Sequence, residues 1–284
     1  MRTFITTLFT IITYHSVSAQ WSNLNSGTNE LLLSISVPSA DTVYCLSESG
    51  VLHATTNGGT NWSTVNTLYA YRIFFQSNLV GFAYGGNELL KTIDGGNNWN
   101  PVLTLDISKY VYGFSMINQN EGFASSMNLS DSVSTYYTSD SGDNWNLISN
   151  DVNNIFDIST MYFWDVNTGF IGNWNGQLFK TSDGGLNWNE VYSTSGMIND
   201  IYFTSSTIGY GVADMEFIKT TDGGDNWTGS VPPFSSIYAA LAITPNGTIH
   251  VTGGNGLNTG TLIKSINNGT NWTQTGTSVQ SYYD

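Results

Sequence analysis

Charged residues are scarce in this chain. They make up 10% of its 284 residues, and 21 Asp and Glu oppose only 7 Lys and Arg. The resulting formal charge of −14 repels phosphate backbones and anionic membrane surfaces, so nucleic acid is not an expected partner. The chain is instead rich in Gly, with 30 residues, and in Asn, with 32. These residues favour turns, which predicts short strands joined by turns rather than exposed helices.

Cysteine and histidine are also too few to build common chemical sites. Cys45 is the single cysteine, so no internal disulfide can form, and we expect it to be a small buried residue. His53 and His250 are the only histidines outside the N-terminal segment, which argues against a histidine-rich metal site. The patterns G-x-S-x-G and H-E-x-x-H and the phosphate-binding Walker loop are missing. The sequence therefore predicts no cofactor and no metal.

No apolar run is long enough to cross a membrane as a helix. The longest, residues 4–14, follows Arg2 and precedes the small residues Val17-Ser18-Ala19, as in a secretory signal peptide. We therefore expect residues 1–19 to be a signal peptide cleaved after Ala19. Residues 20–284 would then form one domain that is extracellular or periplasmic.

One eight-residue pattern, Ser/Thr-x-Asp/Asn-x-Gly-x-Asn-Trp, occurs six times and is called the box here. Its acidic or amide residues are Asn57, Asp94, Asp140, Asp183, Asp222 and Asn267. Its tryptophans are Trp62, Trp99, Trp145, Trp188, Trp227 and Trp272, spaced 37 to 46 residues apart. Such a period indicates a repeat architecture in which each unit packs against its neighbours.

Each repeat carries three short apolar segments before the box and a fourth after it. Four strands per repeat, with no helical periodicity, predict an all-β propeller of four-stranded antiparallel blades. There are six complete units, so we expect six blades. Trp21 falls on the same spacing and leaves seven blades as the alternative.

The box itself is expected to be structural. Its Asp or Asn can accept backbone N–H groups in a turn, and its Gly permits the positive φ of a tight reversal. Its indole adds a large apolar contact, so Trp188→Ala should cost roughly 3–5 kcal/mol. The paired acids Asp140 and Asp143 suggest a cation site as an alternative. However, two boxes have Asn in place of the first acid, and no D-x-D-x-D-G order occurs.

The box resembles the Asp-box, or BNR, repeat of sialidases, xyloglucan-cleaving glycosidases, sortilin-type receptors and photosystem II assembly factors. The stretch GFAYGGNELLKTIDGGNNW (residues 81–99) is most similar to the assembly factors and their secreted bacterial relatives. The resemblance implies a propeller that serves as a scaffold for other proteins. The basic patch associated with that role cannot form here, because Arg72 is the only arginine outside the expected signal peptide.

The same shortage bears on enzymatic function. The resemblance to sialidases implies an arginine triad, which one arginine cannot supply, so sialidase chemistry is excluded. The resemblance to xyloglucan-cleaving glycosidases implies only two carboxylates, about 5–9 Å apart. Carboxylates available for that alternative on one face are Glu48, Glu88, Asp106, Asp131, Asp214 and Glu216.

We expect instead a non-enzymatic module that binds a protein or carbohydrate at one face. This top face carries the loops between the second and third strands of each blade and the loops between blades. Trp174 lies there in a polar turn, outside the box spacing. The further ligand-binding candidates are Tyr69, Tyr71, Tyr110, Glu88, Asp131, Asp214 and Glu216.

Overall fold

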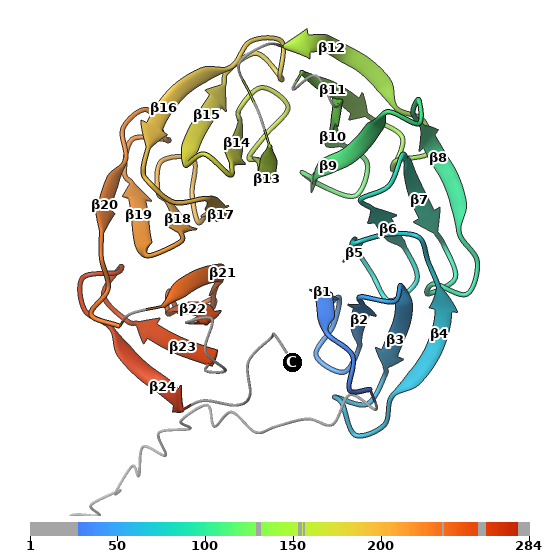
Figure 1. Cartoon of the computed structure of the whole chain (residues 1–284), viewed down its shortest axis with the longest axis horizontal. Helices are drawn as coiled ribbons and strands as arrows, with labels where there is room; N and C mark the ends of the chain where they lie inside the picture. The colour runs from blue at the N-terminus through green and yellow to red at the C-terminus, as the bar shows by residue number, and fades with distance from the viewer. Residues whose placement is uncertain are drawn as a thin grey trace, which may run out of the picture.

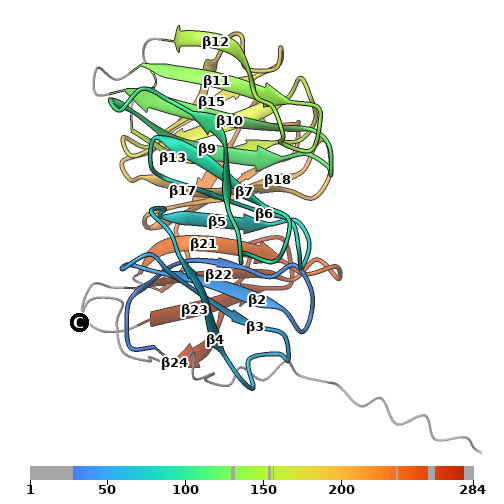
Figure 2. The same ribbon diagram turned by 90° about the vertical axis from the view of Figure 1, so that its right-hand side faces the viewer.

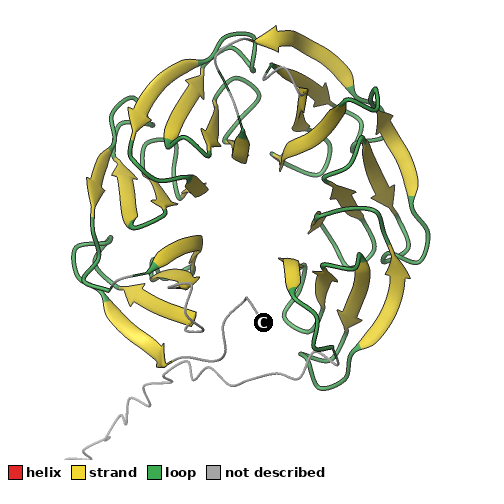
Figure 3. Cartoon of the chain, in the orientation of Figure 1, coloured by secondary structure: helices red, strands yellow, loops and turns green. Residues whose placement is uncertain are grey.

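The computed structural model describes residues 28–128, 132–152, 155, 157–234, 236–254 and 260–277. Over these ranges the chain consists of strands and loops, with no helix (Figure 3). The strands form six four-stranded antiparallel sheets around a central opening, so the six-bladed propeller is confirmed (Figure 1). The expected signal peptide and Trp21 lie outside the described residues. No helix of membrane-spanning length and hydropathy occurs in the described ranges.

The blades follow one another along the chain, each with four consecutive strands. Blades 1 and 2 consist of β1 (Leu32–Ser36), β2 (Val43–Ser47), β3 (Val51–Thr55), β4 (Ser63–Thr67), β5 (Arg72–Phe75), β6 (Gly81–Tyr84), β7 (Glu88–Thr92) and β8 (Asn100–Thr104). Blades 3 and 4 consist of β9 (Lys109–Met116), β10 (Gly122–Asn128), β11 (Val133–Thr138), β12 (Asn146–Val152), β13 (Ile158–Phe163), β14 (Gly169–Asn173), β15 (Gln177–Thr181) and β16 (Asn189–Ser193). Blades 5 and 6 consist of β17 (Ile198–Phe203), β18 (Gly209–Ala213), β19 (Glu216–Thr220), β20 (Thr228–Ser230), β21 (Ile237–Ile243), β22 (Ile249–Gly254), β23 (Gly260–Ser265) and β24 (Thr273–Thr277).

Within a blade the strands pair in chain order, and the first strand lies nearest the axis (Figure 1). Seen edge-on, the molecule is a disc whose loops gather at two faces (Figure 2). The top face is the one defined above by its loops. The opposite face, called the box face, carries the six boxes and the turns between the first and second strands of each blade.

Aromatic side chains fill the spaces between neighbouring blades. Tyr44 of blade 1 stacks on Phe75 of blade 2 at 3.6 Å between ring centroids, and Phe123 of blade 3 stacks on Phe163 of blade 4 at 3.7 Å. A glycine opens the second strand in several blades because the ring at the end of the first strand lies directly against it. A Cβ on Gly169, for example, would lie 2.5 Å from the ring of Phe163. Buried apolar clusters thus join each pair of blades that follow one another in the chain, from blades 1 and 2 to blades 5 and 6.

The inner strand of each blade has one edge that pairs with no other strand. Side chains of the preceding blade accept hydrogen bonds from some of the backbone N–H groups on this edge. Such edges carry backbone N–H groups that need acceptors. The bonds that do this run from Ile73 N to Ser34 Oγ (3.1 Å), Phe75 N to Ser36 Oγ (2.8 Å), Phe163 N to Ser115 Oγ (3.0 Å) and Leu241 N to Asp200 Oδ2 (2.9 Å). These polar residues therefore fix the positions of successive blades around the axis.

Each box is a hydrogen-bonded turn. In blade 2, Thr92 Oγ1 donates to Asp94 Oδ1 (2.9 Å) and accepts from Gly96 N (3.0 Å). The other carboxylate interactions come from Asn98, whose backbone N–H binds Oδ1 (2.9 Å) and whose Nδ2 binds Oδ2 (2.7 Å). Both carboxylate oxygens are thus occupied by the turn itself. The equivalent side-chain bond from Asn144 is the main reason why the pKa of Asp140 falls to about 2.

The second acid of the paired boxes has a separate role between blades. Asp143 accepts a hydrogen bond from Lys91 Nζ of the preceding blade at 2.7 Å, and Asp225 accepts one from Lys180 at 2.5 Å. Lys91 is 7% exposed, also donates to Ser141 O (2.8 Å), and lies 5.9 Å from the ring centroid of Phe82. The two acids of a pair therefore serve different partners. No cluster of three or more metal-ligating residues occurs in the described ranges.

We expect Lys91 and Asp143 to be energetically coupled across the boundary between blades 2 and 3. Because the lysine is buried and the aspartate exposed, the coupling should be about 1 kcal/mol, at the upper end for partly exposed ion pairs. A double-mutant cycle with Lys91→Met and Asp143→Ala, measured by urea denaturation, gives this value. Additive single effects would show that the pair does not join the blades.

Trp227→Ala should destabilise the protein by about 3–5 kcal/mol. The indole is 7% exposed, and its ring lies edge-on to Phe170 of the preceding blade and Phe203 of its own blade, at 6.0 and 5.8 Å. Chemical denaturation would measure the loss. Trp174→Ala is the matched control, since Trp174 is 61% exposed and its truncation should change stability by less than about 0.5 kcal/mol.

Candidate functional site

A channel of about 460 Å³ runs along the propeller axis. Residues of all six inner strands line it, among them Ile35, Phe114, Met161 and Ala240. Two charged side chains, Arg72 and Asp200, are found among its described lining residues. The channel is therefore mostly neutral, with one positive and one negative group contributed by blades 2 and 5.

Both charged groups are anchored to the protein backbone. Arg72 Nη1 donates to Leu33 O of blade 1 at 3.1 Å. The carboxylate of Asp200 accepts from Ile201 N and Leu241 N, each at 2.9 Å. Burial raises the pKa of Asp200 to about 6, while these backbone N–H groups and the charge of Arg72 act against the rise.

The top-face end of the channel opens into a second hollow, of about 330 Å³, which we call the top mouth. Its lining includes the rings of Tyr71, Tyr112 and Trp174, the guanidinium-bearing side chain of Arg72, and Met197. Trp174 is 61% exposed and Tyr71 is 51% exposed. Large aromatic surface that is open to solvent beside a cationic group is typical of a recognition site.

Local backbone structure holds these rings in place. Trp174 comes directly after β14, and its backbone N–H donates to Asp157 O at 2.9 Å. Tyr71 N donates to Tyr84 O at 3.0 Å, which fixes the start of blade 2. Gly85 has a φ of 120°, and a Cβ there would lie 2.9 Å from the Tyr71 ring. Only glycine leaves space for the Tyr71 ring in this position.

The structure brings the sequence-predicted aromatic residues to the top mouth or next to it. Trp174 and Tyr71 line the hollow directly. Tyr69, 79% exposed, lies 6.5 Å from Tyr71 between ring centroids. Tyr110 is half-buried, and its ring lies 6.3 Å from that of Tyr112. The four predicted aromatics thus belong to one surface over blades 2, 3 and 4.

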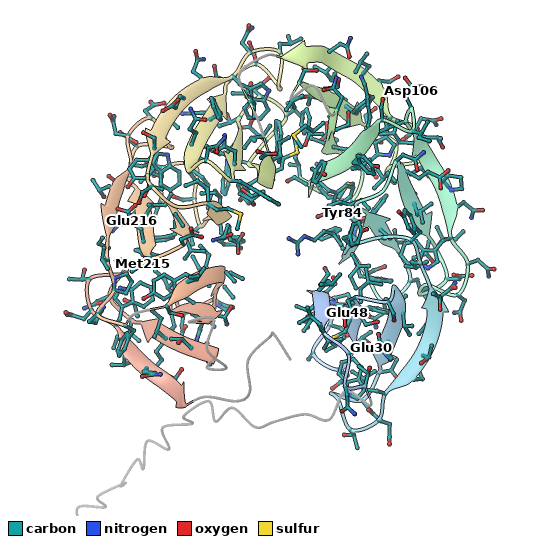
Figure 4. All side chains as sticks on the ribbon, in the orientation of Figure 1. Glu30, Glu48, Tyr84, Asp106, Met215 and Glu216 are labelled. Atoms are coloured by element: carbon teal, nitrogen blue, oxygen red, sulfur yellow. The ribbon has the colours of Figure 1, made fainter. Side chains whose placement is uncertain are left out.

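The predicted acids do not gather there. Glu88 accepts from Thr104 Oγ1 (3.4 Å) within blade 2, and Asp214 accepts from Asn199 Nδ2 (3.3 Å) beside blade 6. Glu216 accepts a hydrogen bond from Tyr192 of blade 4, and burial together with this carboxylate raises the pKa of Tyr192 to about 12. Asp131 lies outside the described residues. Figure 4 shows Glu48, Asp106 and Glu216 in three separate parts of the ring.

Arg72 and Tyr112 are the main mouth residues that the sequence did not single out as ligand-binding candidates. In the sequence, Arg72 bore only on sialidase activity, because a single arginine cannot form an arginine triad. Tyr112 lies two residues after Tyr110 in β9, and regular strand geometry would place both rings on one face. The pairing of β9 with β10 is irregular between Val111 and Gly113, so the sequence pattern does not show how the Tyr112 ring is directed. Only the closure of the ring places blades 2, 3 and 4 around one opening.

Comparison with known proteins supports the fold. No protein-family model and no curated protein matches the chain in sequence. Its structure is similar to that of YCF48 bound to a D1 peptide, with a TM-score of 0.66 and 19% identity over 90% of this chain and 88% of that one. YCF48 from Cyanidioschyzon merolae gives a TM-score of 0.62 and 16% identity over 80% and 81% of the two chains.

A glycoside hydrolase is also similar in structure. The GH74 xyloglucanase from Xanthomonas campestris gives a TM-score of 0.65 and 13% identity over 88% of this chain and 48% of that one. These neighbours agree with the resemblance that the box sequence suggested. At such identities they establish the propeller fold, and function has to be inferred from the residues of the site.

Asp200 should make stability depend on pH. Its pKa is raised in the folded state, so its contribution to stability is complete below 3.8 and is lost as the pH rises through about 6. The unfolding free energy of the wild type minus that of Asp200→Asn should therefore decrease over this window. Urea denaturation at a series of pH values measures it, with Glu48→Gln, an exposed acid, as control. A difference that stays constant with pH would contradict the burial of the charge.

Proposed function

We propose that this chain is a non-enzymatic binding propeller that captures a peptide segment of a partner protein at its top mouth. The observation that carries this proposal is the convergence of Tyr71, Tyr112 and Trp174 around Arg72 at the open end of the axial channel. Exposed rings held by a rigid backbone lose little conformational entropy when they bind.

The chemistry of the mouth suits a peptide with an apolar or aromatic side chain. The three rings offer stacking surfaces, and Met197 adds an adaptable apolar contact. Arg72 uses Nη1 to bind Leu33 O, and its exposed guanidinium has further N–H donors for a ligand carbonyl or carboxylate. The channel beyond the mouth has a volume of about 460 Å³, which leaves room for side chains of the peptide.

The structural neighbours support a peptide ligand by analogy. One YCF48 structure contains a bound D1 peptide, so a propeller of this shape can hold a peptide. The recognition residues of this chain have to be its own, because the two proteins share 19% identity.

The alternative is a glycoside hydrolase, and the arrangement of carboxylates favours binding over this alternative. Hydrolysis of this kind needs two carboxyl groups about 5–9 Å apart across a groove. The described channel lining contains one carboxylate, Asp200, and backbone N–H groups bind both of its oxygens. Glu48, Asp106 and Glu216 lie in three separate parts of the ring (Figure 4), and the candidates closest to the last two, Glu88 and Asp214, are bonded to Thr104 and Asn199.

A random peptide display library selected on the purified protein tests the proposal. We expect enriched sequences to share an apolar or aromatic position. Their affinity, measured by fluorescence polarisation, should fall at least about tenfold in Trp174→Ala and in Arg72→Gln, the size of a central interface contact. Val231→Ala, an exposed top-face residue that does not line the mouth, should bind like the wild type.

Two results would overturn the proposal. One is a library that yields no sequence preferred over selection on the Trp174→Ala protein. The other is hydrolysis of polysaccharide by the wild type that is lost on substituting a top-face carboxylate. Thermal unfolding of each variant distinguishes a lost contact from a lost fold.

A further inference from the structure

A separate hollow of about 610 Å³ lies on the box face, at the boundaries between blades 4, 5 and 6. We call it the aromatic pocket, because Tyr162, Trp164, Tyr202, Phe203 and Tyr210 form much of its wall. Its remaining lining residues, among them Thr204, Thr244 and Asn268, are neutral. None of these residues is charged, although the chain as a whole has a formal charge of −14.

The pocket arises from a size difference at one repeated position. The turn after the inner strand is closed by the same backbone bond in successive blades: Trp164 N to Thr168 O (2.9 Å), Thr204 N to Ile208 O (3.0 Å) and Thr244 N to Thr248 O (3.0 Å). Trp164, Thr204 and Thr244 are therefore structurally equivalent. An indole in blade 4 forms a wall, and the small threonines of blades 5 and 6 leave the space in front of it open.

The same position is closed off in blade 2. Gln76 is equivalent, since its backbone N–H binds Val80 O at 2.9 Å. Its side-chain Nε2 donates to Asn118 O of blade 3 at 2.8 Å and so crosses the boundary between the blades. At this boundary a polar side chain therefore bridges the blades, where the aromatic pocket has an indole and open space.

The walls are held rigid, yet part of the aromatic surface stays open. Tyr162 stacks on Phe203 at 5.6 Å between centroids and lies 6.0 Å from Tyr202 at an angle of 60°. Tyr210 is buried, and its hydroxyl donates to Asn268 Oδ1 at 3.2 Å. Tyr202 is 44% exposed, and Trp164 is half-buried. A ligand would meet preformed ring surfaces without having to order them.

We propose that the aromatic pocket binds a neutral carbohydrate. Sugar rings present C–H groups that pack on aromatic faces. Their hydroxyls can donate to the Thr204 oxygen, whose own proton is bonded to Ile208 O, and can accept from the amide group of Asn268, whose Oδ1 is bonded to Tyr210. With no charged side chain in the lining, the pocket offers nothing to neutralise an anionic or cationic ligand after desolvation. This site is on the opposite face from the top mouth and shares no lining residue with it.

Titration of the purified protein with neutral cello-, manno- and N-acetylglucosamine oligosaccharides, followed by intrinsic tryptophan fluorescence and calorimetry, tests the proposal. At least one series should bind saturably, with an affinity that changes less than about twofold between low and high salt, because screening acts only on charges. Trp164→Thr, which copies the residue of blades 5 and 6, should weaken binding at least about tenfold.

Tyr202→Ala gives a second variant in case Trp164→Thr unfolds, since the Tyr202 ring is more exposed and its loss should weaken binding without abolishing the fold. Trp174→Ala, on the other face, should bind the oligosaccharide like the wild type, which separates this site from the proposed peptide site. The proposal is wrong if no neutral oligosaccharide binds, if charged ones such as polygalacturonate bind more tightly, or if a proline-rich peptide binds the pocket in their place.

Discussion

Burial of each blade against its neighbours is the interaction on which the rest of this structure depends. A four-stranded sheet has two faces, and in blades 2 to 5 both are covered by the blades on either side. Close ring stacks such as Phe123 on Phe163 provide that cover, and glycines such as Gly169 permit it by removing a Cβ from the path of the ring. The functional surfaces follow from this geometry, because the blades must leave an axis and two faces of loops.

Several polar side chains near the axis form hydrogen bonds that join one blade to the next. Ser34 and Asp200 both accept the backbone N–H of the next inner strand, although one is a neutral hydroxyl and the other a carboxyl group. The acids of the boxes are equally occupied, either by their own turn or by a lysine of the preceding blade. Functional chemistry is therefore best sought where rings and donors remain open after these bonds have been made.

The two hollows argued above to bind ligands offer such groups, and they differ in electrostatics. The top mouth combines exposed rings with Arg72, which suits a peptide with carbonyl or carboxylate acceptors. The aromatic pocket of the box face combines rings with hydroxyl and amide groups but no charge, which suits a neutral sugar. Under the two proposals above, the rigid disc separates a peptide site on one face from a carbohydrate site on the other.

The sequence alone determined the repeat and the strand order and favoured six blades over seven, because the box spacing and the turn chemistry are local. It also identified Trp174 and Tyr71 as aromatics in loops of one face. It could not show that Arg72 and Tyr112 complete the same mouth, or that Glu216 is bound by Tyr192 instead of facing a ligand. Both contacts join residues of different blades that are about 24 to 100 positions apart in the sequence. Only the arrangement of the blades around the axis brings such residues together.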